Sequence, residues 1–154
     1  MVMNSENKEI LIRQMQVEDL PQVYKLGLFC FDIWEVPYQA WTVREVAYHF
    51  EAEKDHCFVA VFNDKVVGFS LGAETYDVML DTGQIEWTAV HPDYHGQNLG
   101  SRLFETNCNS MIKKGKRRIV TDVTQTNDAA RRMVERAGFQ IVATVNFWIK
   151  EYKA

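Results

Sequence analysis

Apolar and polar residues alternate along the chain in two kinds of pattern, which separate predicted strands from predicted helices. Alternating or continuous apolar runs are typical of β-strands, and they occupy residues 9–15, 57–62, 65–72, 84–90 and 117–124. Apolar residues three and four positions apart predict helices after Asp19, over residues 41–52, from Leu99 and after Asn127. The last apolar run, residues 139–152, predicts a long strand or a hairpin.

Residues at the ends of these elements support the assignment. Asp19 precedes the first predicted helix as an N-cap, and Asn63-Asp64 joins two strand-like runs as a hairpin turn would. The second helix is expected to bury the face that carries Val43, Val46, Ala47 and Phe50.

The order of predicted elements indicates the fold class. It runs strand, two helices, three strands, helix, strand, helix, and then a strand or β hairpin. Strands interleaved with helices predict an α/β fold, in which helices cover a mixed sheet. With 154 residues and no repeat or linker, residues 1–154 are expected to form a single domain.

Composition and charge narrow the function classes. A net charge of −4 argues against a nucleic-acid partner, and the one basic run, Lys113–Arg118, is expected to cap the preceding helix. No apolar run is long enough to cross a membrane, and the polar N-terminal residues have no signal-like core. Three cysteines form no metal-type spacing, which favours a cytoplasmic protein with reduced thiols.

The stretch HPDYHGQNLGSRLF, residues 91–104, indicates either a metal site or a phosphate site. His91, Asp93 and His95 alternate, as ligands on an extended chain would, but Pro92 and the glycines that follow favour a turn. A strand, a glycine-containing turn and a helix expose unpaired backbone N–H groups that favour an anion. We therefore expect a phosphate group here and no metal.

The same stretch lies in a longer segment that resembles a known signature. IEWTAVHPDYHGQNLGSRLF resembles the acetyl-CoA-binding motif of the GNAT superfamily of N-acetyltransferases, and NDAARRMVERAGF resembles that superfamily's second motif. The order of elements over essentially the whole chain is similar too. Three positions depart from the pattern: His95 replaces Arg or Gln, Asn98 replaces Gly, and Val134 replaces a Tyr that protonates the departing CoA thiolate.

The resemblance implies acetyl-CoA as the cosubstrate and assigns the residues that bind it. The pantetheine arm would pair with the strand edge at Ala89 and Val90, and Asn127 would contact the arm, cap its helix, or do both. The diphosphate would lie on the N–H groups of His95, Gly96, Gln97, Asn98, Leu99, Gly100 and Ser101.

Transfer to an amine requires a base, because a protonated nitrogen has no free electron pair. Glu86 is the candidate: it lies an even number of residues before Val90, so both side chains are expected on one face of the strand. A salt bridge is the alternative role for Glu86, and His91 is the next candidate base. The donor of a proton to the thiolate stays open among water, Tyr94, Tyr76 and Tyr152.

The acceptor is expected near the aromatic stretch between the first two helices. Trp34, Tyr38 and Trp41 lie there beside acidic residues and suit a cationic amine, although core packing would equally explain them. The segment VPYQAWTVREVAYHF resembles the corresponding region of ribosomal-protein and peptide N-terminal acetyltransferases.

The sequence therefore predicts an N-acetyltransferase that acts on a small-molecule amine or a peptide N-terminus. The alternatives are a non-catalytic acyl-CoA-binding regulatory module, which Val134 supports, and a metal-dependent hydrolase. A homodimer is a further expectation, because an apolar hairpin over Val142–Ile149 could pair between chains.

Overall fold

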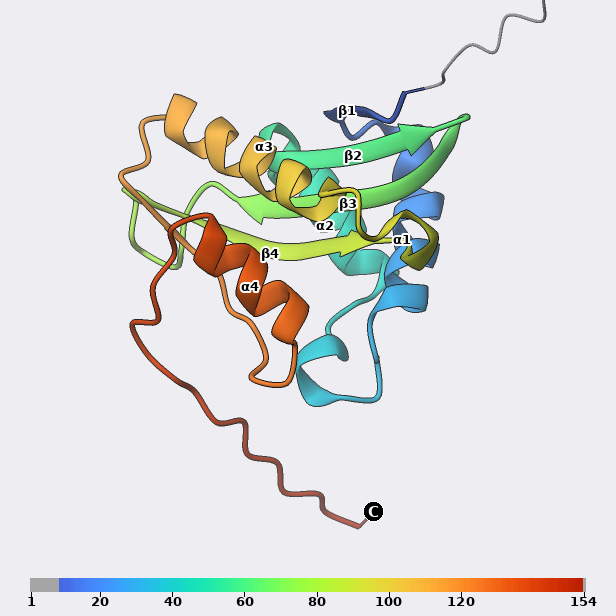
Figure 1. Cartoon of the computed structure of the whole chain (residues 1–154). Coiled ribbons are helices and arrows are strands. Elements are labelled where there is room, and N and C mark those ends of the chain that lie inside the picture. The colour runs from blue at the N-terminus through green and yellow to red at the C-terminus, as the bar shows by residue number, and fades with distance from the viewer. Residues whose placement is uncertain (1–8, 154) are drawn as a thin grey trace, which may run out of the picture.

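A five-stranded mixed sheet forms the centre of the protein in the computed structural model, which describes residues 9–153 (Figure 1). The strands lie in the order of the sequence: β1 (Leu11–Gln14), β2 (Cys57–Phe62), β3 (Lys65–Ala73), β4 (Thr82–Val90) and β5 (Arg118–Val120). Neighbouring strands from β1 to β4 are antiparallel, whereas β4 and β5 are parallel. Residues 1–8, which belong to the polar N-terminal stretch, lie outside the described residues.

Helices cover both faces of this sheet (Figure 1). One face carries α1 (Leu20–Cys30) and α2 (Val43–Ala52), and the other carries α3 (Leu99–Lys113) and α4 (Asp128–Arg136). This arrangement confirms the predicted α/β class with a mixed, helix-covered sheet. None of the helices within residues 9–153 has the length and apolar character needed to span a membrane.

Local signals account for several boundaries. Asn63 and Asp64 both have positive φ, which gives β2 and β3 the tight hairpin that was predicted. Thr42 caps α2 by accepting a hydrogen bond from the Glu45 N–H. Asp19 occupies the N-cap position of α1, as predicted, but its side chain makes no cap hydrogen bond to this helix. Its carboxylate instead accepts two hydrogen bonds from the Arg13 guanidinium, at 2.6 and 2.9 Å.

The apolar core has a part on each face of the sheet. Under α1 and α2 it contains Val23, Leu26, Trp41, Phe69, Leu71 and Trp87, and under α3 and α4 it contains Leu99, Leu103, Phe104 and Met111. The buried face of α2 differs from the prediction. Val43 is 61% exposed, and His49 is buried beside Val46, because α2 turns a polar side chain toward two carboxylates.

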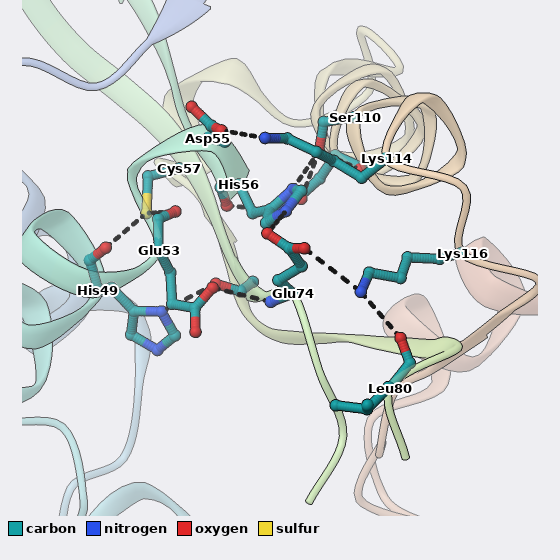
Figure 2. A network of polar contacts seen from close by, with 12 residues as sticks. His49, Glu53, Asp55, His56, Cys57, Glu74, Leu80, Ser110, Lys114 and Lys116 are labelled. Carbon is teal, nitrogen blue, oxygen red and sulfur yellow. Dashed lines mark hydrogen bonds and ion pairs between the residues drawn. The ribbon is translucent and has the colours of Figure 1, made fainter. Parts of the chain in front are cut away.

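A network of hydrogen bonds and ion pairs connects one end of the sheet to α3 (Figure 2). Buried His56 contacts the Ser110 hydroxyl through Nδ1 at 2.7 Å, and Lys114 pairs with Asp55 at 2.7 Å. Lys116 pairs with Glu74 and donates to the Leu80 carbonyl. The basic run after α3 is therefore used in contacts between elements.

The end of the chain departs most from the prediction. Pairing of β5 covers residues 118–120 alone, although residues 117–124 were predicted as a strand. Residues 140–153 contain no strand or hairpin and are exposed, so the predicted β hairpin is wrong for this conformation. A strand requires a partner edge for its N–H and C=O groups, and these residues extend away from the sheet (Figure 1).

Candidate active site

A cleft of about 1070 Å³ opens where β4 and β5 separate. The two strands pair only over residues 82–84 and 118–120, while β4 continues to Val90. The Thr121 hydroxyl donates to the Ile85 carbonyl at 2.9 Å, and beyond this link the edge of β4 faces the cleft. A splayed pair of parallel strands of this kind leaves backbone groups of β4 available to a ligand.

Most of the predicted site residues line this cleft. They are Tyr38, Glu86, Ala89, Val90, His95, Gly96, Asn98, Leu99, Gly100, Ser101 and Asn127. Gln97 is exposed beside them and is not part of the lining.

The turn before α3 has the geometry of an anion cradle. Gly96 and Asn98 both have positive φ (77° and 59°), which bends the chain sharply before Leu99. Asn98 makes no side-chain capping hydrogen bond, so the first N–H groups of α3 keep their donor capacity. Gly100 leaves open space next to them: a Cβ there would meet only Met133 Sδ at 3.5 Å and Val90 Cγ2 at 3.7 Å.

His95 and Asn127 already have partners within the chain. His95 Nε2 donates to the Val90 carbonyl at 2.8 Å, across the end of β4. Asn127 caps α4 by accepting from the Ala130 N–H at 3.1 Å, so its cap role is confirmed.

Glu86 lies at a β-bulge, which sequence parity could not reveal. Leu71 pairs with Trp87 and Gly72 pairs with Ile85, so Glu86 is the extra residue in β4. The bulge turns Glu86 toward α2, whereas Val90 packs with the cluster under α3. The expectation that Glu86 and Val90 share a face is therefore wrong, because the extra residue shifts the alternation.

Behind Glu86, His49 lies between two carboxylates. Its Nε2 is 3.2 Å from Glu45 Oε1 and 3.4 Å from Glu86 Oε2, and its Nδ1 donates to the Gly72 carbonyl at 3.0 Å. Burial alone would lower the pKa of His49, but contacts with the two carboxylates outweigh it and raise this pKa to about 9. The ring is thus an imidazolium at neutral pH, and the same contact lowers the pKa of Glu45.

The three side chains Glu45, His49 and Glu86 have ligand atoms close enough together to hold a metal ion. A metal would need a neutral imidazole, whereas the raised pKa of His49 favours the proton. The metal ligands considered from sequence lie elsewhere: the His95 ring turns to Val90, and His91 accepts from the Asp93 N–H at 3.2 Å.

Asp122 is a second acidic residue in the cleft, and sequence reasoning missed it. Burial raises the pKa of Asp122, and the negative charge of Glu86 adds to this rise. Asp32 also lines the cleft. Asp122 follows a short strand with no motif around it, so only the fold brings it near Glu86.

The aromatic residues predicted for the acceptor separate in space. Tyr38 lines the cleft, and its hydroxyl lies 3.2 Å from the Thr124 hydroxyl. Trp34 is 86% exposed and outside the cleft lining. Trp41 is buried in the core, where it stacks on Phe69, so it supports the wall from behind and does not face an acceptor.

The candidate proton donors to a leaving thiolate also lie in different parts of the structure. Tyr94 and Val134 line the cleft, whereas Tyr76 does not and Tyr152 lies in the exposed end of the chain. Arg132 and Arg136 of α4 line the cleft as well, and no sequence argument had selected them.

Comparisons with known proteins point to one family. Residues 22–139 match the model of the Acetyltransferase (GNAT) family. A Bacillus subtilis (strain 168) protein, provisionally named a [ribosomal protein bS18]-alanine N-acetyltransferase, is 27% identical over 129 residues, covering 84% of this chain and 80% of its own. N-alpha-acetyltransferase 30 of Schizosaccharomyces pombe is 29% identical over 106 residues, 67% of each chain.

A solved structure has the same fold. It is the aminoglycoside N-acetyltransferase AAC(6')-Iy in complex with CoA, which superposes with a TM-score of 0.74 at 20% identity and covers 96% of this chain and 99% of its own. The family match spans most of the chain, including the cleft, the turn before α3 and α4. The chain therefore belongs to the GNAT acetyltransferase family and is an enzyme of the acyltransferase class.

Proposed function

We propose that this enzyme, a single catalytic domain over residues 1–154, transfers an acetyl group from acetyl-CoA to a primary amine of a peptide N-terminus or a small molecule. The observation that carries the proposal is the position of Glu86 in the cleft between the splayed strands, which also contains the turn before α3. One end of the cleft offers N–H donors for phosphate, and the other offers carboxylates for a cation.

The free N–H groups at the start of α3 fit the diphosphate of acetyl-CoA. Oxygen atoms of a diphosphate would accept hydrogen bonds from residues 95–101, with Gly96 and Gly100 allowing close approach. Arg132 and Arg136, on the α4 side of the cleft, would add positive charge.

The open edge of β4 fits the amides of the pantetheine arm. Ala89 and Val90 would pair with the arm as a neighbouring strand would. His95 already donates to the Val90 carbonyl, so pairing at that carbonyl requires the imidazole to move aside. Asn127 holds its cap through the side-chain oxygen, which leaves its NH₂ group free to donate to the arm.

We propose Glu86 as the general base. An alkylamine with a pKa of about 10 is almost fully protonated at neutral pH, and its proton must leave before the nitrogen attacks the thioester carbonyl. Glu86 would take that proton, directly or through a water molecule, as the C–N bond forms and the C–S bond breaks. His49, held by Glu45 and Gly72, would orient the carboxylate from behind.

The CoA thiolate must gain a proton after the C–S bond breaks. Val134 has no proton to give, and Tyr94 is the one tyrosine among the three candidates that lines the cleft. We propose that Tyr94 or water supplies this proton.

The acceptor end of the cleft favours a cation. Asp32, Glu86 and Asp122 would attract an ammonium group, and the Tyr38 ring would contact it. The Bacillus subtilis relative is named for an alanine of a ribosomal protein, and the Schizosaccharomyces pombe relative is named for N-alpha-acetyl transfer, which supports the peptide N-terminus as the first class to test. We expect the reaction in the cytoplasm, since the three cysteines are unpaired. The working unit is expected to be a homodimer.

Glu86→Gln tests the proposal. The substitution preserves shape but cannot accept a proton, so turnover at neutral pH should fall by roughly 10² or more. Acetyl-CoA affinity should stay within about twofold, since backbone groups hold the cofactor. The loss of turnover should shrink as the pH rises toward the pKa of the free amine, because the solution then supplies the neutral acceptor.

Glu51→Gln is the matched control, since it makes the same change at an exposed position of α2. A Glu86→Gln enzyme with the wild-type pH–rate profile at full rate would contradict the base role. His91, the next candidate from sequence, does not line the cleft, whereas Asp122 does. Binding of CoA without thiol release on any amine in a broad panel would instead favour the non-catalytic acyl-CoA-binding module, which Val134 supports.

A further inference from the structure

His49 is fully buried, and its Nε2 atom has no hydrogen-bond partner among the residues that the structure describes. Its other ring nitrogen, Nδ1, donates to the Gly72 carbonyl at 3.0 Å, which fixes the orientation of the ring. Nε2 points to carboxylate oxygens of Glu45 and Glu86, but neither contact is aligned as a hydrogen bond. A buried polar atom without a partner calls for an explanation, and an ion bound at that atom is one.

Two regular elements bring these three side chains together. Glu45 and His49 are four residues apart in α2, so they lie on one face of the helix. Glu86 is the extra residue of the bulge in β4, which turns its carboxylate toward that face. Side chains that project from helices and strands form more precise ligand sites than side chains on loops.

The separations match those of ligands around a tetrahedral zinc ion. Bonds of about 2.0–2.2 Å from zinc to nitrogen and oxygen place the ligand atoms about 3.3–3.6 Å apart at the tetrahedral angle. His49 Nε2 is 3.2 Å from Glu45 Oε1 and 3.4 Å from Glu86 Oε2, and the three ligand atoms all lie within 4.8 Å of one another. Both glutamate side chains are partly exposed, which gives the carboxylates room to turn toward an ion.

The groups around this cluster are of the kind that support metal ligands. A ligating histidine usually donates its second ring N–H to a carbonyl or a carboxylate, as His49 does to Gly72. The Trp87 indole donates to Glu45 Oε1 at 3.0 Å and leaves this oxygen a second electron pair. Glu86 lines the cleft, so a water molecule could reach the fourth position of an ion bound here.

We propose that Glu45, His49 and Glu86 form a binding site for a divalent transition metal ion, and that zinc is the ion that fits it best. An imidazole nitrogen and carboxylate oxygens are ligands that zinc binds in proteins, with water in the remaining position. Magnesium and calcium instead require about six or more oxygen ligands, which this cluster does not offer.

A metal ion and a proton compete for His49. The proton occupies the ring in the metal-free protein, because contacts with the two carboxylates raise the pKa of His49 to about 9. Two carboxylates and one imidazolium leave the cluster with one uncompensated negative charge. A divalent ion between two carboxylates and a neutral imidazole compensates both charges. Each ion that binds displaces the His49 proton, which weakens the affinity and favours reversible binding.

Occupation of this site would inhibit the enzyme. A Glu86 oxygen that holds a metal ion cannot accept a proton from the amine. This consequence rests on the proposed function, whereas the site itself does not. Zinc would therefore act as a reversible inhibitor, and removal of the ion with EDTA would restore turnover.

Titration of the full chain with Co²⁺, without acetyl-CoA or an acceptor, tests the site. Co²⁺ substitutes for zinc and absorbs visible light strongly only in a tetrahedral site. We expect one such ion per chain, displaced by Zn²⁺ but not by Mg²⁺. Glu45→Gln and His49→Gln should each weaken binding by more than about tenfold, since each removes a ligand. Glu51→Gln is the matched control for Glu45→Gln, because it makes the same change at an exposed position of α2 and should bind as the wild type does.

Three results would overturn the site. They are the absence of a tetrahedral spectrum, a thiolate charge-transfer band, which would assign the ion to a cysteine, and equal affinity in all the variants. Thermal unfolding verifies that each variant is folded, and Glu45→Gln decides the question if the buried His49→Gln variant does not fold. Zinc binding without inhibition would support the site and would contradict the base role of Glu86 instead.

Discussion

At the scale of single residues, Gly100 controls how closely a diphosphate can approach the start of α3. A Cβ at this position would make only ordinary contacts, with Met133 and Val90, so the fold should tolerate a larger residue. The two methyl groups that Gly100→Val adds to the Cβ would occupy space in the cleft that Gly100 lines. We expect acetyl-CoA affinity to fall more than tenfold, which corresponds to about 1.4 kcal/mol.

Isothermal titration calorimetry measures this affinity, and thermal unfolding verifies that the variant is folded. Gly100→Ala is the graded control and should weaken binding less, because its single methyl group fits without displacement. Undiminished affinity in folded Gly100→Val protein would remove the turn before α3 as the phosphate site.

Sequence reasoning at this scale succeeded where the chemistry is local. The glycine-containing turn before α3 and the cap at Asn127 follow from residue type and a few neighbours. It failed for Trp41 and His49, because burial of these side chains depends on which face a helix or loop presents to the sheet. Asp122 was missed for the same reason: only the parallel pairing of β5 brings it near Glu86.

At the scale of elements, Asn127 joins the start of α4 to the cleft. Its oxygen holds the cap, and its NH₂ group is proposed to contact pantetheine. Asn127→Ala should lower the free energy of unfolding by about 1 kcal/mol and weaken acetyl-CoA binding. Asn127→Asp keeps the accepting oxygen and replaces the donor with a negative charge, so its stability should be close to wild type while its affinity falls.

Chemical denaturation and calorimetry on the same two variants separate the roles. If Asn127→Asp binds acetyl-CoA as tightly as the wild type, Asn127 serves only as a cap. Ser or Thr at position 127 provides a second control, since both accept the same hydrogen bond without offering an amide donor.

Elements whose limits are set by turns were predicted well, and elements that depend on distant partners were not. The hairpin at Asn63-Asp64 fixes β2 and β3 from two adjacent residues. The bulge at Glu86 arises from the register of β4 against β3, which periodicity cannot show. Residues 140–153 have a strand pattern without a strand, because pairing requires an edge that their own conformation does not reach.

At the scale of the whole molecule, two buried histidines should set the pH range of stability. His56 is buried beside Ser110, and burial lowers its pKa below the usual 6.5. The unfolded chain therefore binds a proton at His56 before the folded chain does. Stability should fall as the pH drops below about 6.5.

His49 has the opposite effect on the pH dependence of stability. Its folded pKa of about 9 lies above the unfolded value of 6.5. The stabilisation from its imidazolium is fully present below pH 6.5 and is lost as the pH rises to 9, a decline on the order of 3 kcal/mol.

Urea denaturation from pH 6 to 9 should show this decline in the wild type and a much flatter profile in His49→Gln. Burial also raises the pKa of Cys108, to about 11, so the unfolded thiol loses its proton first as the pH approaches 9, and this smaller decline is common to both proteins. An equal decline in both proteins would mean that His49 is neutral in the fold, and a metal ion between Glu45 and Glu86 would then become the better account of this cluster.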